Sequence, residues 1–304
     1  MKTDRKAIKG NGMTGNTKFD EFIAEEVRAI KGVYVPVKAG LLRRALIRQT
    51  RCTKLHPNPD DEFCMPKVGP NYGIISDYMS RFREERAHSR QYCDERLVVE
   101  KIRPDGYLIL NGHHRWAAAL RLGYPWIPIE IVDLTDETDI RAILKRSNHD
   151  KRVALDLDEV VFANGDAPME KALPFPVRKV YKERLRLGIP ALFRFLNKKG
   201  YDVWVYTAGY YSADYIRRLF RKYHVHISGA VTGLGRKTAD AAKVRKEMET
   251  LIGNKYPVTI HVDNDMLLRV SGRTKEVGEY AIGGASAEWS QRVMEIIKKI
   301  ERQV

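Results

Sequence analysis

Two aspartates stand two residues apart at the end of an apolar run, in the stretch VALDLDEVVF. Asp156 and Asp158 lie where a buried strand would finish. Further along the chain, Thr207 ends a second apolar run, YDVWVYT, and Asp263 follows a third, PVTIHV. Functional side chains of a parallel α/β sheet collect beyond the carboxyl ends of its strands, so we expect these four residues to lie close together. The alternative is that the strands simply finish in water.

Grouped carboxylates of this kind favour a metal ion. Like charges that close cannot all stay ionised unless a cation neutralises them, and oxygen ligands without Cys or His suit Mg²⁺. Lys237, in the loop GLGRKT, and Lys243 lie on the polar approach to the third run. A metal, a lysine and a hydroxyl around one carboxylate form a site for a phosphoryl group, and a second aspartate can move protons. The pattern therefore predicts phosphoryl chemistry that depends on Mg²⁺.

The elements that would position these residues alternate between strands and helices. The pattern predicts strands over 153–157, 202–207 and 257–262, separated by helices over about 189–199, 212–223 and 238–252. Such alternation is typical of a parallel sheet with crossover helices on both faces. The segment between Asp158 and the run that ends at Thr207 is too short to form a large cap over the substrate, so the site would be open to bulky substrates. Five basic residues there either line the entry or face solvent: Arg178, Lys179, Lys182, Arg184 and Arg186.

The second half of the chain resembles the haloacid dehalogenase (HAD) superfamily. The resemblance rests on DLDEV, the threonine that ends the second run, a following lysine and VDND, and it covers roughly residues 150–290. Within the superfamily, LDLDEVV, VYTAGYYSADYIRRLF and HVDND are most similar to the phosphatases that act on the RNA polymerase C-terminal tail. Val160 stands where that branch commonly has a threonine.

The resemblance implies a role for each matching residue. Asp156 would be the nucleophile that forms an aspartyl-phosphate, and Asp158 would be the general acid and base. Thr207 would bind phosphoryl oxygens, and Lys237 would neutralise the nucleophile and the phosphate. Asp156, Asp158 and Asp263 would hold Mg²⁺, with Asp158 contributing its backbone carbonyl. The implied activity is that of a Mg²⁺-dependent phosphatase, a phosphoric monoester hydrolase.

The first half contains a different arrangement, LILNGHHRWAAALRLG. It reads as a strand, a tight Asn-Gly turn, two histidines, an arginine and a helix. Backbone N–H groups at a helix start bind anions, and arginine clamps a phosphate with two parallel hydrogen bonds. We therefore expect a phosphate or nucleotide site of five consecutive residues, Asn111, Gly112, His113, His114 and Arg115. The alternative is that the histidines only cap and pack the turn.

Around this turn the pattern predicts a small α+β domain. Helices are expected over 19–32, about 75–90 and 116–123, and strands over 33–37, 97–102, 107–110 and 127–134. The strands 97–102 and 107–110 flank a Pro-Asp-Gly turn and would form a hairpin. A further helix over 135–147, with Thr135 as its N-cap, would link the two halves.

With LHPNP upstream, residues 33–134 resemble the ParB/sulfiredoxin fold, in which a box of this kind binds nucleotide phosphates. The sulfiredoxin branch has a catalytic cysteine where this chain has His113, so sulfinic acid reduction is not expected. The box is closer to the D-G-H-T-R of the ADP-dependent free serine kinases, whose aspartate and upstream glutamate serve phosphoryl transfer. Here Asn111 replaces the aspartate, and Glu100 is a weak match for the glutamate. The resemblance thus favours nucleotide or DNA binding over kinase activity.

Composition limits the classes of protein that fit. The chain has 304 residues, 43% of them hydrophobic, which suits two packed domains. Its net charge of +15 favours an anionic partner, with a solvated basic surface as the alternative. No apolar run approaches the ~20 residues that span a membrane, and the start lacks the apolar core of a signal peptide, so we expect a cytoplasmic protein. A zinc site assembled from Cys52, His56, Cys64 and Cys93 is a weaker reading than free thiols.

Together these patterns predict an α/β protein with a flexible basic tail at 1–18 and a ParB/sulfiredoxin-like α+β domain at 19–134. A linking helix at 135–149 would lead to a HAD-like Rossmannoid domain at 150–304, with a small cap or none. The leading functional hypothesis is a Mg²⁺-dependent phosphatase with a nucleotide- or nucleic-acid-binding module, acting on a phosphoprotein, a nucleotide or a nucleic-acid end. The alternatives are a bifunctional kinase/phosphatase and a ParB-like DNA- or nucleotide-binding regulator with an inactive HAD domain.

Overall fold

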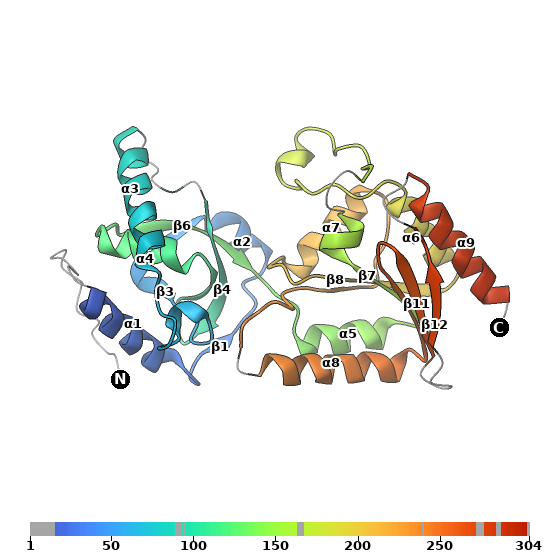
Figure 1. Cartoon of the computed structure of the whole chain (residues 1–304), viewed down its shortest axis with the longest axis horizontal. Coiled ribbons are helices and arrows are strands. Elements are labelled where there is room, and N and C mark those ends of the chain that lie inside the picture. The colour runs from blue at the N-terminus through green and yellow to red at the C-terminus, as the bar shows by residue number, and fades with distance from the viewer. Residues whose placement is uncertain are drawn as a thin grey trace. The chain divides into compact units, whose positions relative to one another are not determined.

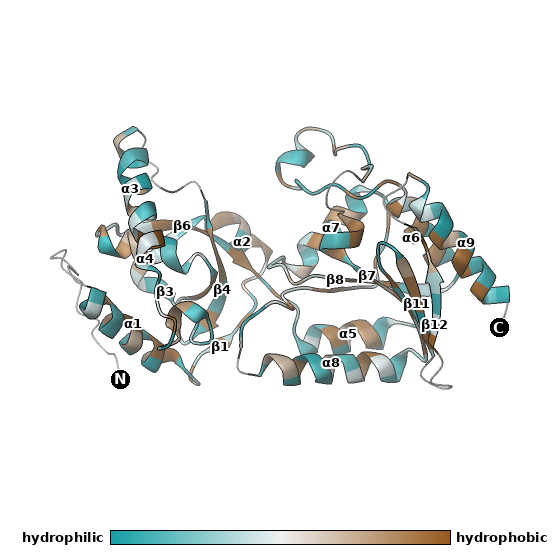
Figure 2. Cartoon of the chain, in the orientation of Figure 1, coloured by the Kyte–Doolittle hydropathy of each residue, from teal (hydrophilic) through white to brown (hydrophobic). Residues whose placement is uncertain are grey.

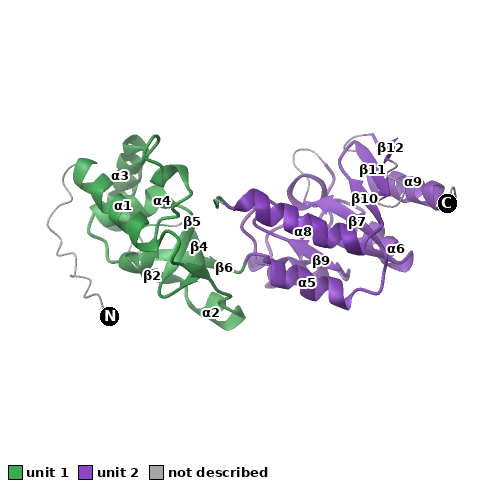
Figure 3. Ribbon diagram, turned by 90° about the horizontal axis from the view of Figure 1, so that it is seen from below, with its two compact units in different colours: residues 1–133, 237–239 green, residues 134–236, 240–304 purple. Residues whose placement is uncertain are grey.

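The chain divides into two compact units, which Figure 3 colours separately. The computed structural model describes residues 16–88, 93, 95–162, 167–238, 240–271, 277–283 and 287–302. Unit 1 comprises residues 1–133 and 237–239, and unit 2 comprises residues 134–236 and 240–304. Most of the tail expected at 1–18 lies outside the described residues, but the first helix already begins at Asn16.

Unit 1 is built on a mixed six-stranded sheet of order β2–β6–β4–β5–β3, with β1 paired to β4 outside this path. Its strands are β1 (Val35–Pro36), β2 (Gln49–Arg51), β3 (Leu55–His56), β4 (Leu97–Arg103), β5 (Tyr107–Asn111) and β6 (Trp126–Val132). The predicted hairpin is confirmed, because β4 and β5 pair antiparallel. β6 runs parallel to β4, and β3 runs parallel to β5. The mixed pairing agrees with the expected α+β character of this half.

Four helices accompany this sheet in the described part of unit 1. They are α1 (Asn16–Ile30), α2 (Leu41–Leu46), α3 (Tyr72–His88) and α4 (His113–Arg121). Phe19 and Ile23 of α1 and Trp116 of α4 share one buried cluster with Val99 and Ile109 of the hairpin. α4 begins three residues earlier than predicted, so both histidines and the arginine of the box lie in its first turn.

Unit 2 contains a six-stranded sheet of order β12–β11–β10–β7–β8–β9. Its strands are β7 (Lys151–Asp156), β8 (Tyr201–Tyr206), β9 (Gly229–Val231), β10 (Val258–Val262), β11 (Met266–Ser271) and β12 (Val277–Ala281). The predicted parallel arrangement is confirmed for β10, β7 and β8, and β9, which was not predicted, adds a further parallel strand beside β8. Two further strands were not predicted: β11 pairs antiparallel with β10, and β12 pairs antiparallel with β11. β11 follows directly on the acidic stretch that had been taken as the end of the sheet.

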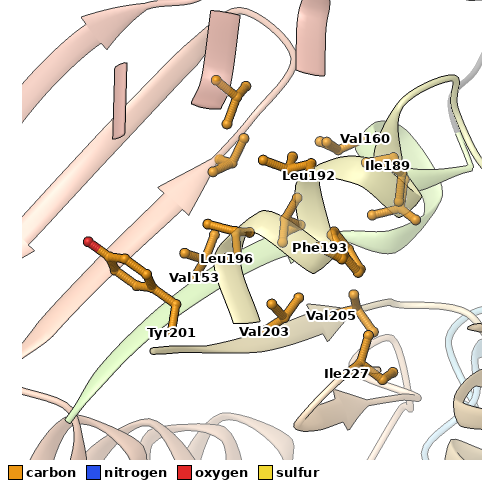
Figure 4. Close-up of a cluster of buried hydrophobic side chains, with 14 of the residues drawn as sticks. Val153, Val160, Ile189, Leu192, Phe193, Leu196, Tyr201, Val203, Val205 and Ile227 are labelled. Atoms are coloured by element: carbon orange, nitrogen blue, oxygen red, sulfur yellow. The ribbon is translucent and has the colours of Figure 1, made fainter. Parts of the chain in front are cut away.

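Helices cover both faces of this sheet, as the strand–helix alternation predicted (Figure 1). α6 (Ile189–Lys198), α7 (Ala213–Lys222) and α9 (Trp289–Arg302) pack on one face, around a core that includes Val153, Val203 and Phe193 (Figure 4). α5 (Glu137–Arg146) and α8 (Ala241–Lys255) share a second cluster with Trp204 and Val231 on the other face. The helix that we expected to be a linker is therefore part of unit 2.

The N-cap of α5 differs from the expected one. The Asp136 side chain caps the helix by accepting a hydrogen bond from the Asp139 N–H, and the Asp139 side chain in turn accepts one from the Asp136 N–H. The Thr135 hydroxyl instead donates to the Ala230 carbonyl of β9 at 3.0 Å, which removes it from the cap. A longer-range contact thus replaced a local one.

The helices of both units mix hydrophobic and hydrophilic residues along their length (Figure 2). This is the pattern of helices that pack one side on a core and leave the other in water. Among the described helices, none has the length and hydropathy to cross a membrane.

Candidate functional sites

The turn between β5 and α4 places the predicted phosphate-binding residues. Gly112 has a φ of 104°, in the left-handed region that glycine adopts without strain. A Cβ at this position would lie 2.8 Å from the Leu97 side chain and 3.2 Å from the Arg115 guanidinium. Glycine is therefore needed both for the turn and for the close approach of the strand to the helix.

The start of α4 offers backbone N–H groups to an anion. Gly112 is its N-cap residue and has no side chain with which to accept a hydrogen bond from the first turn. The first N–H groups of a helix have no intrahelical partner, and they carry the positive end of the helix dipole. The geometry of the turn thus provides the anion-binding feature that the sequence predicts.

Arg115 is held by the protein itself. It is buried, its Nη1 donates to the Glu95 carboxylate at 3.0 Å and to the Arg96 carbonyl at 3.3 Å, and its Nη2 donates to Asn111 Oδ1 at 2.8 Å. These contacts fix Asn111 beside the start of α4. They also use three of the five N–H donors of the guanidinium, so the predicted clamp competes with Glu95 for Nη1.

The two histidines hold the ends of the loop that runs from Asn58 to Asn71. His113 Nε2 accepts the Asn58 N–H at 3.1 Å, and His114 Nε2 accepts the Asn71 N–H at 3.1 Å. Burial lowers the pKa of His113 to about 4, and burial also lowers the pKa of His114. Neutral rings that accept backbone N–H groups match the alternative given above, in which the histidines pack and cap the turn.

The same loop carries Asp61, which pairs with Lys237. The two side chains approach to 3.3 Å, and Lys237 Nζ also lies 3.4 Å from a Glu62 carboxylate oxygen. Burial pushes the pKa of Asp61 up, but His113, the Phe63 N–H and Lys237 outweigh it and hold the pKa below its usual value. Lys237 was predicted to neutralise Asp156. In the structure it belongs to unit 1 and forms ion pairs with Asp61 and Glu62.

The zinc alternative finds no support among the described residues. Cys52, Cys64 and Cys93 are free thiols. Burial raises the pKa of Cys52 and of Cys64 to about 12, and that of Cys93 to about 11, so all three keep their protons. In the part of the chain that the structure describes, no group of three or more His, Cys, Asp or Glu side chains could hold a metal ion.

In unit 2 the carboxyl ends of β7 and β8 bring part of the predicted catalytic set together. Asp156 is in register with Tyr206 at the end of the two strands, and a π-helical turn, Leu157–Val161, follows it. Thr207 is buried, and its hydroxyl donates to Asp158 Oδ2 while accepting the Gly209 N–H at 2.8 Å. Asp156 Oδ1 accepts the Glu159 N–H at 2.7 Å. The Asp158–Thr207 contact is therefore shown.

Asp263 follows β10, and its Oδ1 accepts the N–H of Asn264 at 2.7 Å. Within the described residues the side chains of Asp156, Asp158 and Asp263 do not form a metal-binding group of three. The expected Mg²⁺ site, to which Asp158 would contribute its backbone carbonyl, stays a prediction. Lys243 lies on α8 and is exposed.

Arg186 does not line an open entry. It is 1% exposed, its guanidinium carbon lies 4.2 Å from the centre of the Trp289 ring, and its Nη1 donates to Asn264 Oδ1 at 2.8 Å. Because Arg186 lies in a run of alternating basic residues, its burial was not predicted from the sequence. Stacking on an aromatic ring is a common environment for a buried arginine.

Comparison with known proteins identifies a family to which part of the first half is similar. Residues 90–148, from before β4 to just beyond α5, match the ParB N-terminal domain family. The chain contains a ParB-like domain. The match includes the β5–α4 turn and its five predicted residues.

Two curated relatives of this chain are both named ATP-dependent L-serine kinase. The protein from Staphylothermus marinus is 39% identical over 66 residues, which cover 21% of this chain and 24% of the relative. The one from Desulfurococcus mucosus is 46% identical over 64 residues, 21% of this chain and 25% of the relative. The chain thus spans about a quarter of the length of the curated relatives that it matches.

A solved structure is also similar, the C-terminally truncated chromosome-partitioning protein ParB from Caulobacter crescentus complexed with CTP-gamma-S. It is 25% identical, and the match covers 34% of this chain and 55% of that chain, with a TM-score of 0.23. At that TM-score the likeness carries no argument about the ParB-like domain.

These comparisons correct the predicted enzyme class. The chain was expected to be a phosphoric monoester hydrolase, whereas its curated relatives are kinases, which transfer phosphoryl groups from a nucleotide. Neither the matched family nor the two relatives named above supports the HAD resemblance, which stays a prediction. The prediction relied on the order of widely spaced motifs in unit 2 and gave too little weight to the compact box in unit 1.

Proposed function

We propose that the ParB-like domain binds a nucleoside triphosphate at the β5–α4 turn, with its phosphates at the start of α4. The observation that carries the proposal is Gly112, whose left-handed backbone opens α4 without a side-chain cap and leaves its first N–H groups to an anion. The names of the two curated relatives support a nucleotide as the source of that anion.

Glu95 gives this proposal a sharp test. Its side chain is 61% exposed and pairs with Arg115, so it competes with any phosphate for the guanidinium. Glu95→Gln replaces a charged acceptor with a neutral one, so it should weaken the hold on Arg115 and tighten the binding of ATP about threefold to tenfold. Arg115→Lys should weaken the binding of ATP by a similar factor. Isothermal titration of the full chain with ATP, CTP and ADP in the presence of Mg²⁺ measures both effects.

The matched control is Glu137→Gln, which removes an exposed carboxylate that pairs with Arg141 on α5. It should leave nucleotide affinity unchanged. If both glutamate variants raise affinity equally, the effect is one of overall charge and the site lies elsewhere. Duplex DNA added as a competitor separates a nucleotide site from the DNA-binding alternative, because binding of DNA alone would contradict the proposal.

A second function, phosphoryl transfer to a small hydroxyl substrate such as serine, is favoured by the identity to the L-serine kinases. The box of this chain has an asparagine where the resembling kinases have an aspartate, and Asn111 Oδ1 accepts from Arg115. Asn111→Asp keeps this acceptor and adds a carboxylate. We expect it to raise serine-dependent production of ADP from ATP, and an unchanged rate would count against a kinase role for this position.

For unit 2 we propose a HAD-like fold, supported by its parallel strand order and by the Asp158–Thr207 contact. No phosphatase activity is inferred for it. A nucleotide-binding regulator with an inactive HAD-like unit is consistent with these features.

A further inference from the structure

Unit 2 contains a cavity of about 400 Å³ that neither the turn of the ParB-like domain nor the carboxylate edge uses. It is lined by residues of the sheet, among them Arg152, Tyr206 and His261, and by residues of α8, among them Met248 and Ile252. Arg152 and His261 lie on the same face of neighbouring parallel strands, with Thr259 opposite Arg152 and Ala154 opposite His261. The volume is within the ~300–1,000 Å³ typical of small-molecule sites.

Arg152 is the unusual member of this lining. It is 9% exposed, its Nε donates to the Thr259 hydroxyl at 2.9 Å, and its Nη1 donates to the Tyr206 hydroxyl. Within the described residues no carboxylate forms an ion pair with it. Its guanidinium carbon also lies 5.9 Å from the centre of the Tyr256 ring. A buried guanidinium held by neutral oxygens and an aromatic ring has lost its hydration without gaining a counter-ion, which costs free energy.

The neighbouring polar groups cannot supply that charge. Burial raises the pKa of Tyr206, so the phenol stays protonated. His261 remains exposed to solvent. Partial burial of its ring, and then the charge of Arg152, lower the pKa of His261, so this imidazole is neutral near pH 7. Since the Tyr206 oxygen accepts from Arg152, its own O–H proton remains for another acceptor.

We propose that this cavity binds a small apolar molecule that carries one anionic group, with Arg152 as the counter-ion and Tyr206 as a hydrogen-bond donor. The apolar body packs against Met248 and Ile252 of α8. Among the lining residues Arg152 and Arg245 are cationic and Glu249 is anionic, which leaves a surplus of one positive charge. A monoanion such as an apolar carboxylate or sulfonate fits this balance, whereas Glu249 and the apolar walls oppose a polyphosphate.

Two fluorescent probes of nearly equal shape test the proposal. 8-Anilinonaphthalene-1-sulfonate is an apolar anion, and N-phenyl-1-naphthylamine has the same rings without the charge. The full chain should bind the sulfonate saturably and at least tenfold more tightly than the amine. Arg152→Met, which keeps a side chain of similar reach without charge, should abolish this preference and leave the affinity for the amine unchanged.

Lys151→Met is the matched control. Lys151 is the neighbouring cation on β7, but it lines a different cavity, with Lys199 and Arg269. This variant should keep the preference for the sulfonate. Equal losses in Lys151→Met and Arg152→Met would show that overall charge, and not this cavity, binds the probe, and would overturn the proposal.

A second variant decides the matter if Arg152→Met does not fold. Leu234 lines the cavity and is partly buried, so Leu234→Trp should fill space that a ligand would occupy. The binding of both probes should fall at least fivefold, with the thermal midpoint little changed. The proposal is overturned if the wild-type chain binds neither probe saturably, binds the two equally well, or binds them unchanged in Leu234→Trp.

Discussion

The β5–α4 turn of unit 1 and the carboxyl edge of unit 2 are built in different ways. The turn consists of five consecutive residues, and one glycine sets its backbone. The edge depends on residues from separate strands, of which the structure joins Asp158 and Thr207 in a hydrogen bond without gathering a metal-binding group among the described residues. A local motif carries its own geometry, whereas a scattered one has only an order along the chain until the tertiary structure is known.

This difference explains which functional inference was wrong. The order of Asp156, Asp158, Thr207 and Asp263 suggested a phosphatase, and the kinase relatives contradict that enzyme class. The consecutive box belongs to the stretch that matches the ParB N-terminal domain. The turn is therefore the better guide to function, and the predictions below test each side of the contrast, beginning with the largest effect.

Gly112→Ala should destabilise the chain the most, by about 4 kcal/mol. The left-handed backbone costs a non-glycine residue ~1–2 kcal/mol, and overpacking adds ~1–3 kcal/mol because the new Cβ would lie 2.8 Å from Leu97. Gly123→Ala is the control, since Gly123 also has a positive φ, of 70°, but nothing lies within 4 Å of its would-be Cβ. Urea denaturation of both variants measures the difference. Equal losses would show that packing against Leu97 is unimportant.

The next effect is a dependence of stability on pH through His113. Burial lowers its pKa to about 4 in the folded chain, against ~6.5 when unfolded, so protonation favours the unfolded state. The stabilisation is complete above pH ~6.5 and is lost as the pH falls towards 4, a change on the order of 3 kcal/mol. His113→Gln can still accept the Asn58 N–H but does not titrate, so its stability should fall less over this range. Urea midpoints at pH 7, 5.5 and 4.5 compare the two, and parallel curves would contradict the assignment.

Much of the arrangement could be read from sequence where the cause is local. The apolar runs of β4, β5, β7, β8 and β10 predicted the strands, and Asn-Gly predicted the turn. The positions of Lys237 and Arg186 could not be predicted in the same way. Lys237 pairs with Asp61, far away in sequence, and Arg186 stacks on Trp289, so both depend on contacts that only the folded chain forms.

Thr207→Val tests the carboxyl edge of unit 2. The hydroxyl donates to Asp158 and accepts the Gly209 N–H, and valine leaves both groups without this partner. Loss of these bonds at a buried site should cost about 1–3 kcal/mol, seen as a lower thermal midpoint. Thr250→Val is the control, because its exposed hydroxyl donates only to the Lys246 carbonyl of its own helix. If the two variants melt alike, the Asp158–Thr207 contact does not hold the edge together.

Asp156→Asn should have the smallest effect of all. Asparagine keeps the oxygen that accepts the Glu159 N–H, so stability should change by less than about 0.5 kcal/mol. Because the chain is not expected to be a phosphatase, the variant and the wild type should release phosphate from p-nitrophenyl phosphate and Mg²⁺ at the same background rate. A nucleophile that forms an aspartyl-phosphate would behave differently, since an amide cannot replace it and the rate would fall by orders of magnitude. Such a fall, from a wild-type rate well above background, would show that the carboxyl edge of unit 2 is catalytic. The contrast between this edge and the β5–α4 turn would then no longer hold.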